Sequence, residues 1–137
     1  MRLPLWTLTV LFAALVAGQA VQGWIPLSFL PPFDAFQGSN LPYWLLLLAQ
    51  LAILAVMACV SWRVHRGRLA PSRRWGLALA WAGALYMAVA LGRISVGLLL
   101  PEAPAWFRTW IPAFFHVVLA GFVLAVCVYH LRKSPLR

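Results

Sequence analysis

Four long apolar runs, separated by short connections that carry most of the charge, constrain this chain more than any other feature. The runs extend over residues 3–21, 41–62, 75–100 and 106–130. A helix of roughly 20 apolar residues crosses the hydrocarbon core of a bilayer, so each run is long enough to span a membrane. The sequence therefore predicts an all-α integral membrane protein, with residues 1–137 forming a single transmembrane domain built as a four-helix bundle.

The composition excludes a water-soluble globular domain as the main architecture. Hydrophobic residues make up 64% of the chain and charged residues only 9%, whereas soluble domains contain about 25% charged residues. A net charge of +9 would suggest nucleic-acid binding in a soluble protein, but here the basic residues cluster beside the apolar runs. We predict contact with membrane lipids and no nucleic-acid partner.

The distribution of arginine indicates how the chain is oriented. Residues 63–74 contain five arginines and no acid, and basic connections of this kind lie on the cytoplasmic side of a membrane. With four spans, Arg2 and the basic tail fall on that same side, and both acids fall in the opposite connections; Arg108 is the exception. The basic residues of the tail are Arg132, Lys133 and Arg137. We predict a protein of a bacterial-type inner (plasma) membrane with both its N- and its C-terminus cytoplasmic.

The first run also fits a cleaved secretory signal peptide. Arg2 precedes the apolar stretch, and residues 18–20, Gly-Gln-Ala, fit a small-x-small cleavage site. We favour a retained first span, because the apolar run is long for a signal peptide and its removal would leave three helices with an N-terminal stub outside.

The longest connection, residues 21–41, combines prolines with aromatic side chains. Pro26, Pro31 and Pro32 exclude a regular helix through it, and aromatic rings favour the headgroup region of a membrane. We expect a loop on the membrane surface with a short interfacial turn. It would act either as an aromatic anchor or as a lid or docking surface for a partner.

Polar side chains gather at one depth in the predicted outer half of the bilayer. Arg93 lies about 10 Å before the exit of the third run at Leu100, and His116 lies about 9 Å beyond Trp110, at 1.5 Å per helical residue. Gln50 lies at a similar depth in the second run, roughly 10 Å from its outer end. An arginine facing lipid is unfavourable by about 2.5 to 3.5 kcal/mol. We therefore expect Arg93 to find partners inside the bundle or to reach outward.

Three interpretations of this cluster stay open. Arg93 could pair with Glu102 or Asp34 as a structural clamp on the outer connections. It could instead form a pocket with His116 and Gln50 for an amphipathic ligand with an anionic or carbonyl head, because guanidinium and imidazole groups suit such a head. It could also contact a polar group of a partner membrane protein.

A stripe of small residues predicts close helix packing by the third run. Its members, four residues apart, are Gly76, Ala80, Ala84, Ala88 and Gly92. Such a stripe lets another helix approach closely. A neighbouring face of the same run carries Tyr86, Ala90, Arg93 and Gly97.

The sequence gives no motif for catalysis or for a metal site. We predict no cofactor, although a bound quinone, or a haem shared between two copies of His116, stays open. The favoured function is a non-catalytic subunit or accessory protein that packs against another membrane protein or self-associates. The alternatives are a lipid- or quinone-binding protein with a polar pocket in the outer leaflet half, and a small membrane enzyme.

Overall fold

The computed structural model of the chain is all-helical over the residues that it describes, 2–37 and 40–134. Four helices are long and apolar enough to cross a membrane: α1 (Arg2–Trp24), α3 (Tyr43–His65), α4 (Arg73–Leu99) and α6 (Trp110–Lys133). Two short helices, α2 (Phe33–Phe36) and α5 (Ala105–Arg108), lie in the connections. The predicted all-α chain with four apolar helices is confirmed. Arg137, which belongs to the predicted basic tail, lies outside the described residues.

The helices begin and end where local backbone chemistry requires it. Helix α1 continues three residues beyond the apolar run and stops at Trp24, just before Pro26, which has no N–H to donate. The fourth run is divided, because Thr109 is extended (φ −80°, ψ 96°) and separates α5 from α6. The expected turn in the long connection is α2, which directly follows Pro31 and Pro32.

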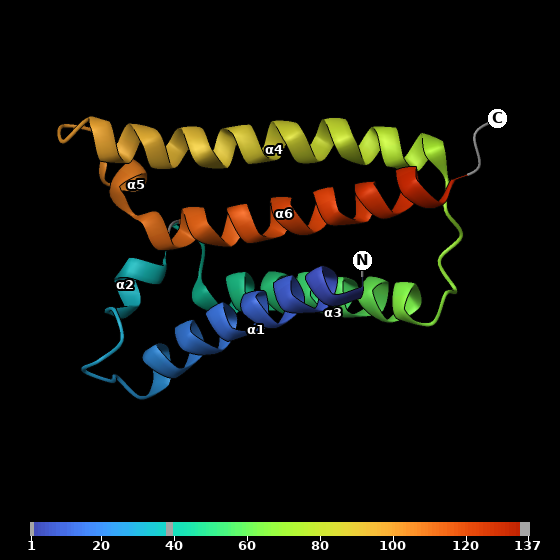
Figure 1. Cartoon of the computed structure of the whole chain (residues 1–137). Helices are drawn as coiled ribbons and strands as arrows, with labels where there is room; N and C mark the ends of the chain where they lie inside the picture. The colour runs from blue at the N-terminus through green and yellow to red at the C-terminus, as the bar shows by residue number, and fades with distance from the viewer. Residues whose placement is uncertain (1, 38–39, 135–137) are drawn as a thin grey trace.

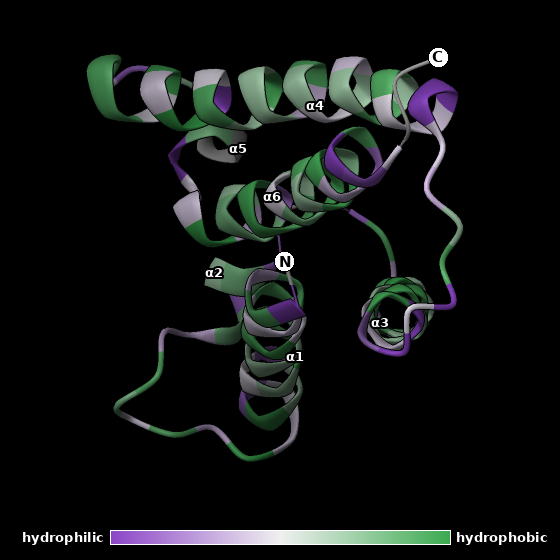
Figure 2. Cartoon of the chain, turned by 45° about the vertical axis from the view of Figure 1, so that its right-hand side comes forward, coloured by the Kyte–Doolittle hydropathy of each residue, from purple (hydrophilic) through white to green (hydrophobic). Residues whose placement is uncertain are grey.

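The four long helices form two antiparallel pairs, α4 with α6 and α1 with α3 (Figure 1). The α4–α6 pair is the more extensive, and α1 joins the two pairs by packing on α6 as well as on α3. Helix α3 stands apart from α4 and α6 and rests mainly on α1 (Figure 2). The start of α1, the end of α6 and the α3–α4 connection lie at one end of the bundle, and α2 and α5 lie at the other (Figure 1).

Glycine permits the close approach of α4 to α6. A Cβ atom at Gly83 would lie 2.8 Å from Cδ2 of Leu124, and one at Gly76 would lie 2.7 Å from Cδ2 of Leu131. Further along the same face, Ala90 and Arg93 are buried. The packed face of α4 is therefore the one that carries Arg93.

The predicted small-residue stripe is mostly outside this contact. Gly76 is buried and Ala80 is partly buried, whereas Ala84, Ala88 and Gly92 are exposed. Nothing lies within 4 Å of a Cβ atom built at Gly92. Within the chain, α6 packs on the neighbouring face because the glycines there allow the closest approach. Packing of the exposed part of the stripe against another chain stays a prediction.

The α1–α3 interface contains two buried polar contacts. The hydroxyl oxygens of Thr9 and Ser61 lie 3.1 Å apart. Nearer the other end, Nε2 of Gln50 donates a hydrogen bond to Oε1 of Gln19 over 2.9 Å. Interhelical hydrogen bonds of this kind contribute about 0.6 kcal/mol each in membranes, so they fix the register of the two helices more than they stabilise them.

The connection between α3 and α4 is held by the last turn of α6. The hydroxyl of Tyr129 donates to the carbonyl oxygen of Leu69 over 2.7 Å. The N–H of Ser72 donates to Nδ1 of His130 over 3.0 Å. Gly67 has a positive φ of 66°, the left-handed conformation that commonly ends a helix, and it turns the chain out of α3.

We expect Gly83→Leu to lower the thermal unfolding midpoint of the full-length chain in detergent, with a loss of about 1 to 3 kcal/mol from overpacking against Leu124. The matched control is Ala82→Leu, one residue along α4 at an exposed position outside the small-residue stripe. That variant should unfold within about 2 °C of the parent, because a change at an exposed site usually costs under about 0.5 kcal/mol. Equal midpoints for the two variants would show that α4 packs on α6 through a different face.

Candidate functional site

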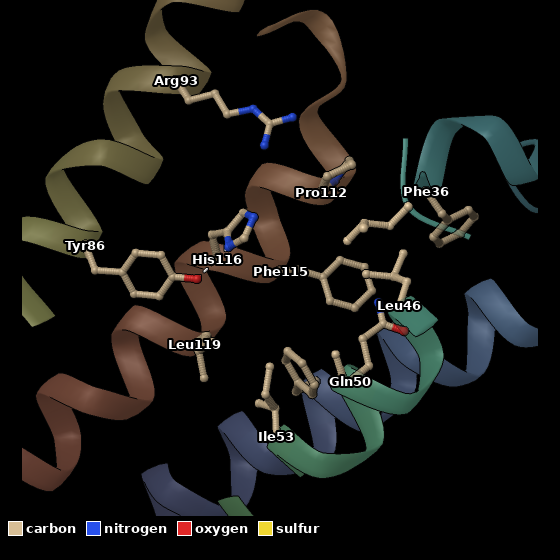
Figure 3. A pocket seen from close by; sticks show the side chains of 13 residues that line it. Phe36, Leu46, Gln50, Ile53, Tyr86, Arg93, Pro112, Phe115, His116 and Leu119 are labelled. Atoms are coloured by element: carbon tan, nitrogen blue, oxygen red, sulfur yellow. Dashed lines mark hydrogen bonds between the residues drawn. The ribbon is translucent and has the colours of Figure 1, made fainter. Parts of the chain in front are cut away.

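A cavity of about 330 Å³ lies between the two helix pairs (Figure 3). Small-molecule pockets occupy about 300 to 1,000 Å³, so this cavity accommodates a head group rather than a whole lipid. Leu41, Ala49 and His116 line it and are exposed, so it opens to the surroundings of the bundle. Its polar lining residues are Gln50, Tyr86, Arg93 and His116.

Arg93 comes from the packed face of α4 and is buried, with 6% of its surface exposed. One guanidinium nitrogen, Nη2, donates a hydrogen bond to Oγ1 of Thr109 over 3.3 Å. Thr109 comes within reach because α5 folds directly against the last turns of α4. A Cβ atom at Gly97 would lie 2.0 Å from the carbonyl oxygen of Phe107, so only glycine allows this approach. Gly97 thereby helps to position the guanidinium at the cavity.

His116 is oriented by Tyr86. The tyrosine hydroxyl lies 2.5 Å from Nδ1 of His116, and the two rings meet edge to face with centroids 5.6 Å apart. Because this contact occupies Nδ1, the imidazole presents Nε2 to the cavity, on the side where Arg93 lies (Figure 3). The pair therefore offers a ligand one imidazole nitrogen beside a guanidinium.

Gln50 reaches the cavity from the opposite wall, on α3 (Figure 3). It is 7% exposed, and its amide nitrogen is bonded to Gln19. Among the described residues, neither Oε1 of Gln50 nor Nε2 of Gln19 has a hydrogen-bond partner. A buried polar atom without a partner is unfavourable by about 1 to 3 kcal/mol.

The remaining walls are apolar and largely aromatic. Phe12 of α1 and Phe115 of α6 meet edge to face, with ring centroids 5.6 Å apart. Phe36 of α2 closes one end, and Ile53 and Leu119 continue the apolar lining. Such walls suit a flat ring or a hydrocarbon chain.

The structure brings three of the five predicted polar residues, Gln50, Arg93 and His116, to one cavity. Asp34 and Glu102 are exposed and do not line it. Arg93 is hydrogen-bonded to the hydroxyl of Thr109. The structural clamp between Arg93 and Asp34 or Glu102 stays a prediction.

Tyr86 was not among the predicted site residues, although it was placed on the face of Arg93. The available signal was its seven-residue spacing from Arg93, two helical turns along the same face. Thr109 carried no such signal, because its contact with Arg93 depends on the extended segment between α5 and α6.

Comparisons with known protein families, with curated proteins and with solved structures give no match for this chain. The described residues contain no group of three or more His, Cys, Asp or Glu side chains that could hold a metal ion. The chemistry of the cavity is therefore the basis for proposing a function.

Proposed function

We propose that the chain is an integral membrane protein that binds an amphipathic ligand with an anionic or carbonyl head. The observation that carries the proposal is a buried guanidinium at the wall of an open, mainly apolar cavity. Arginine presents a planar fork of N–H donors that matches carboxylate, phosphate or carbonyl oxygens. The apolar walls would hold the adjoining part of the ligand, and its tail would leave through the opening into the membrane.

Membrane insertion with both termini cytoplasmic belongs to the same proposal. Large apolar side chains cover the outside of the bundle: Trp81 is 80% exposed and Leu98 is 77% exposed. Exposure on this scale suits lipid rather than water. Arg2, Gly67 and Lys133 line one recess at the end opposite α2 and α5, which supports placing both termini and the basic connection together on the cytoplasmic side. The cavity then lies in the outer half of the bilayer.

Retention of the first span is supported by what α1 contributes. Gln19 and Thr9 of α1 are the partners of Gln50 and Ser61. Removing α1 would leave both α3 side chains without these partners and would remove Phe12 from the cavity wall. We therefore propose that residues 2–24 remain in the mature protein.

We expect cytoplasmic readings from reporter domains fused after Arg74 and after the C-terminus, because basic connections stay on the inner side. A reporter fused after Glu102, in the connection that carries one of the two acids, should read outside and serves as the matched control. An outside reading after Arg74 would contradict the proposed topology.

The ligand proposal is tested by thermal unfolding of the delipidated full-length chain in a neutral maltoside detergent. Added oleate, an anionic amphiphile, should raise the unfolding midpoint, because a ligand at 100 times its Kd stabilises the folded state by about 2.7 kcal/mol. A shift of about 5 °C or more is expected. The uncharged analogue oleyl alcohol is the control and should give a smaller shift. Equal shifts from the two amphiphiles would contradict recognition of the head by Arg93.

The accessory-subunit function is the second candidate, and one observation favours it. Ala84, Ala88 and Gly92 present an exposed row of small residues on α4, which suits a helix of another membrane protein or of a second copy. The double variant Ala84→Leu/Ala88→Leu should then change the assembly size measured by light scattering. No described feature favours the enzyme alternative, which stays a prediction.

A further inference from the structure

The amide of Gln50 is the feature of the cavity that binding of a single anionic head does not explain. Its side chain is more than nine-tenths buried and lines the cavity, yet its oxygen has no partner among the described residues. Buried polar atoms are almost always hydrogen-bonded in native proteins. The Gln50 side chain therefore leaves one acceptor without a partner at this wall, on the far side of the cavity from Arg93 (Figure 3).

We propose that the ligand of this cavity carries oxygen atoms at two opposite ends of a flat ring, the chemistry of a lipid-soluble quinone or quinol. One oxygen would accept hydrogen bonds from Arg93 and meet His116. The other would pair with Gln50. The inference rests on the proposed function, since it names the class of ligand that the same cavity takes.

The lining favours a ring over a simple hydrocarbon chain. Phe12, Phe36 and Phe115 all line the space between the two polar walls. Aromatic side chains pack well against a planar ring in offset or edge-to-face arrangements. A fatty acid has one polar end and would leave the amide of Gln50 without a partner.

The glutamine pair suits both redox forms of such a ring. In the present arrangement Gln50 donates to Gln19 and leaves its own oxygen as a buried acceptor without a partner, which matches the hydroxyl of a quinol. Turning both amides over preserves one hydrogen bond between them and leaves a donor at Gln50 without a partner, which matches the carbonyl of a quinone. Tyr86 and His116 offer the same versatility at the other end, because a hydroxyl and an imidazole can each donate or accept.

The test compares two probes on the delipidated full-length chain in mild detergent, with bound fractions measured by native mass spectrometry. The probes are a 1,4-benzoquinone with a decyl tail and oleate. The variants are Gln50→Leu and the double variant Gln19→Leu/Gln50→Leu, which leaves no unpaired amide in the α1–α3 interface. The control is Ser61→Ala, which also removes an α1–α3 hydrogen bond but lies outside the cavity.

Both glutamine variants should bind the quinone about three- to tenfold more weakly than Ser61→Ala does, the range expected for one lost hydrogen bond. Their oleate binding should change less than twofold. Quinone binding within twofold of the control in both glutamine variants would overturn the inference, as would wild-type protein that binds oleate but not the quinone.

The Arg93→Leu variant distinguishes failure of the quinone inference from failure of the proposed function. If it weakens both probes while the glutamine variants weaken neither, the proposed function stands and the quinone inference fails. If Arg93→Leu weakens neither probe, or if the wild type binds neither, both fail.

Discussion

Replacing Gly97 by alanine is expected to lower the thermal unfolding midpoint of the full-length chain in detergent by at least about 10 °C, for a loss of about 3 kcal/mol or more. The added Cβ atom would lie 2.0 Å from the carbonyl oxygen of Phe107 and 2.8 Å from its carbonyl carbon. Both are backbone atoms, so no side-chain rotation can relieve the overlap. Helix α5 would have to move away from α4.

The matched control is Gly92→Ala on the same helix. Nothing lies within 4 Å of a Cβ atom there, and alanine favours a helix over glycine by about 0.5 to 1 kcal/mol. This variant should unfold at the parent temperature or slightly above it. If Gly97→Ala behaved in the same way as Gly92→Ala, the connection between α4 and α6 would have to lie elsewhere.

The second large effect is expected at Arg93. Arg93→Leu should reduce the amount of amphiphile that stays bound through purification by about tenfold or more, because a hydrogen bond to a charged group contributes about 1.5 to 3 kcal/mol. Arg93→Lys should restore only part of the binding, since lysine keeps the charge but loses the planar fork of donors. The measurement is the bound fraction in native mass spectra of protein purified from membranes.

Arg108→Leu is the control for this effect. Arg108 is exposed at the same end of the bundle and does not line the cavity. The Arg108→Leu substitution therefore removes the same charge without changing the site. Membrane insertion of the Arg93→Leu variant should not decrease, because leucine is far easier to insert than arginine. Equal retention by the two variants would contradict a role of the guanidinium in binding.

The helices and the depth of the polar residues could be predicted from the sequence for simple physical reasons. Length and hydropathy define the four apolar helices. Consecutive antiparallel helices place residues at equal distances from a turn at equal depth. Arg93, His116 and Gln50 were predicted at similar depth for this reason, and the structure places all three at one cavity.

The faces that pack could not be read from the sequence alone. The regular stripe through Ala84 and Ala88 was the stronger pattern, yet α6 packs on the face where Gly83 and Gly97 allow the closest approach. A glycine that touches a neighbouring backbone has the same sequence signal as one with open space beside it, such as Gly92. Thr109 was missed because its contact with Arg93 depends on how α5 meets α4, whereas Tyr86 carried the signal of its spacing from Arg93.

An experimental structure of the chain purified in a lipid nanodisc tests the central claim most directly. The account predicts non-protein density in the space lined by Phe12, Ile53, Phe115 and Leu119, with its polar end at Arg93 and its tail leaving beside His116. Helix α3 closed against α6, with these side chains filling the space and no density beside Arg93, would contradict it.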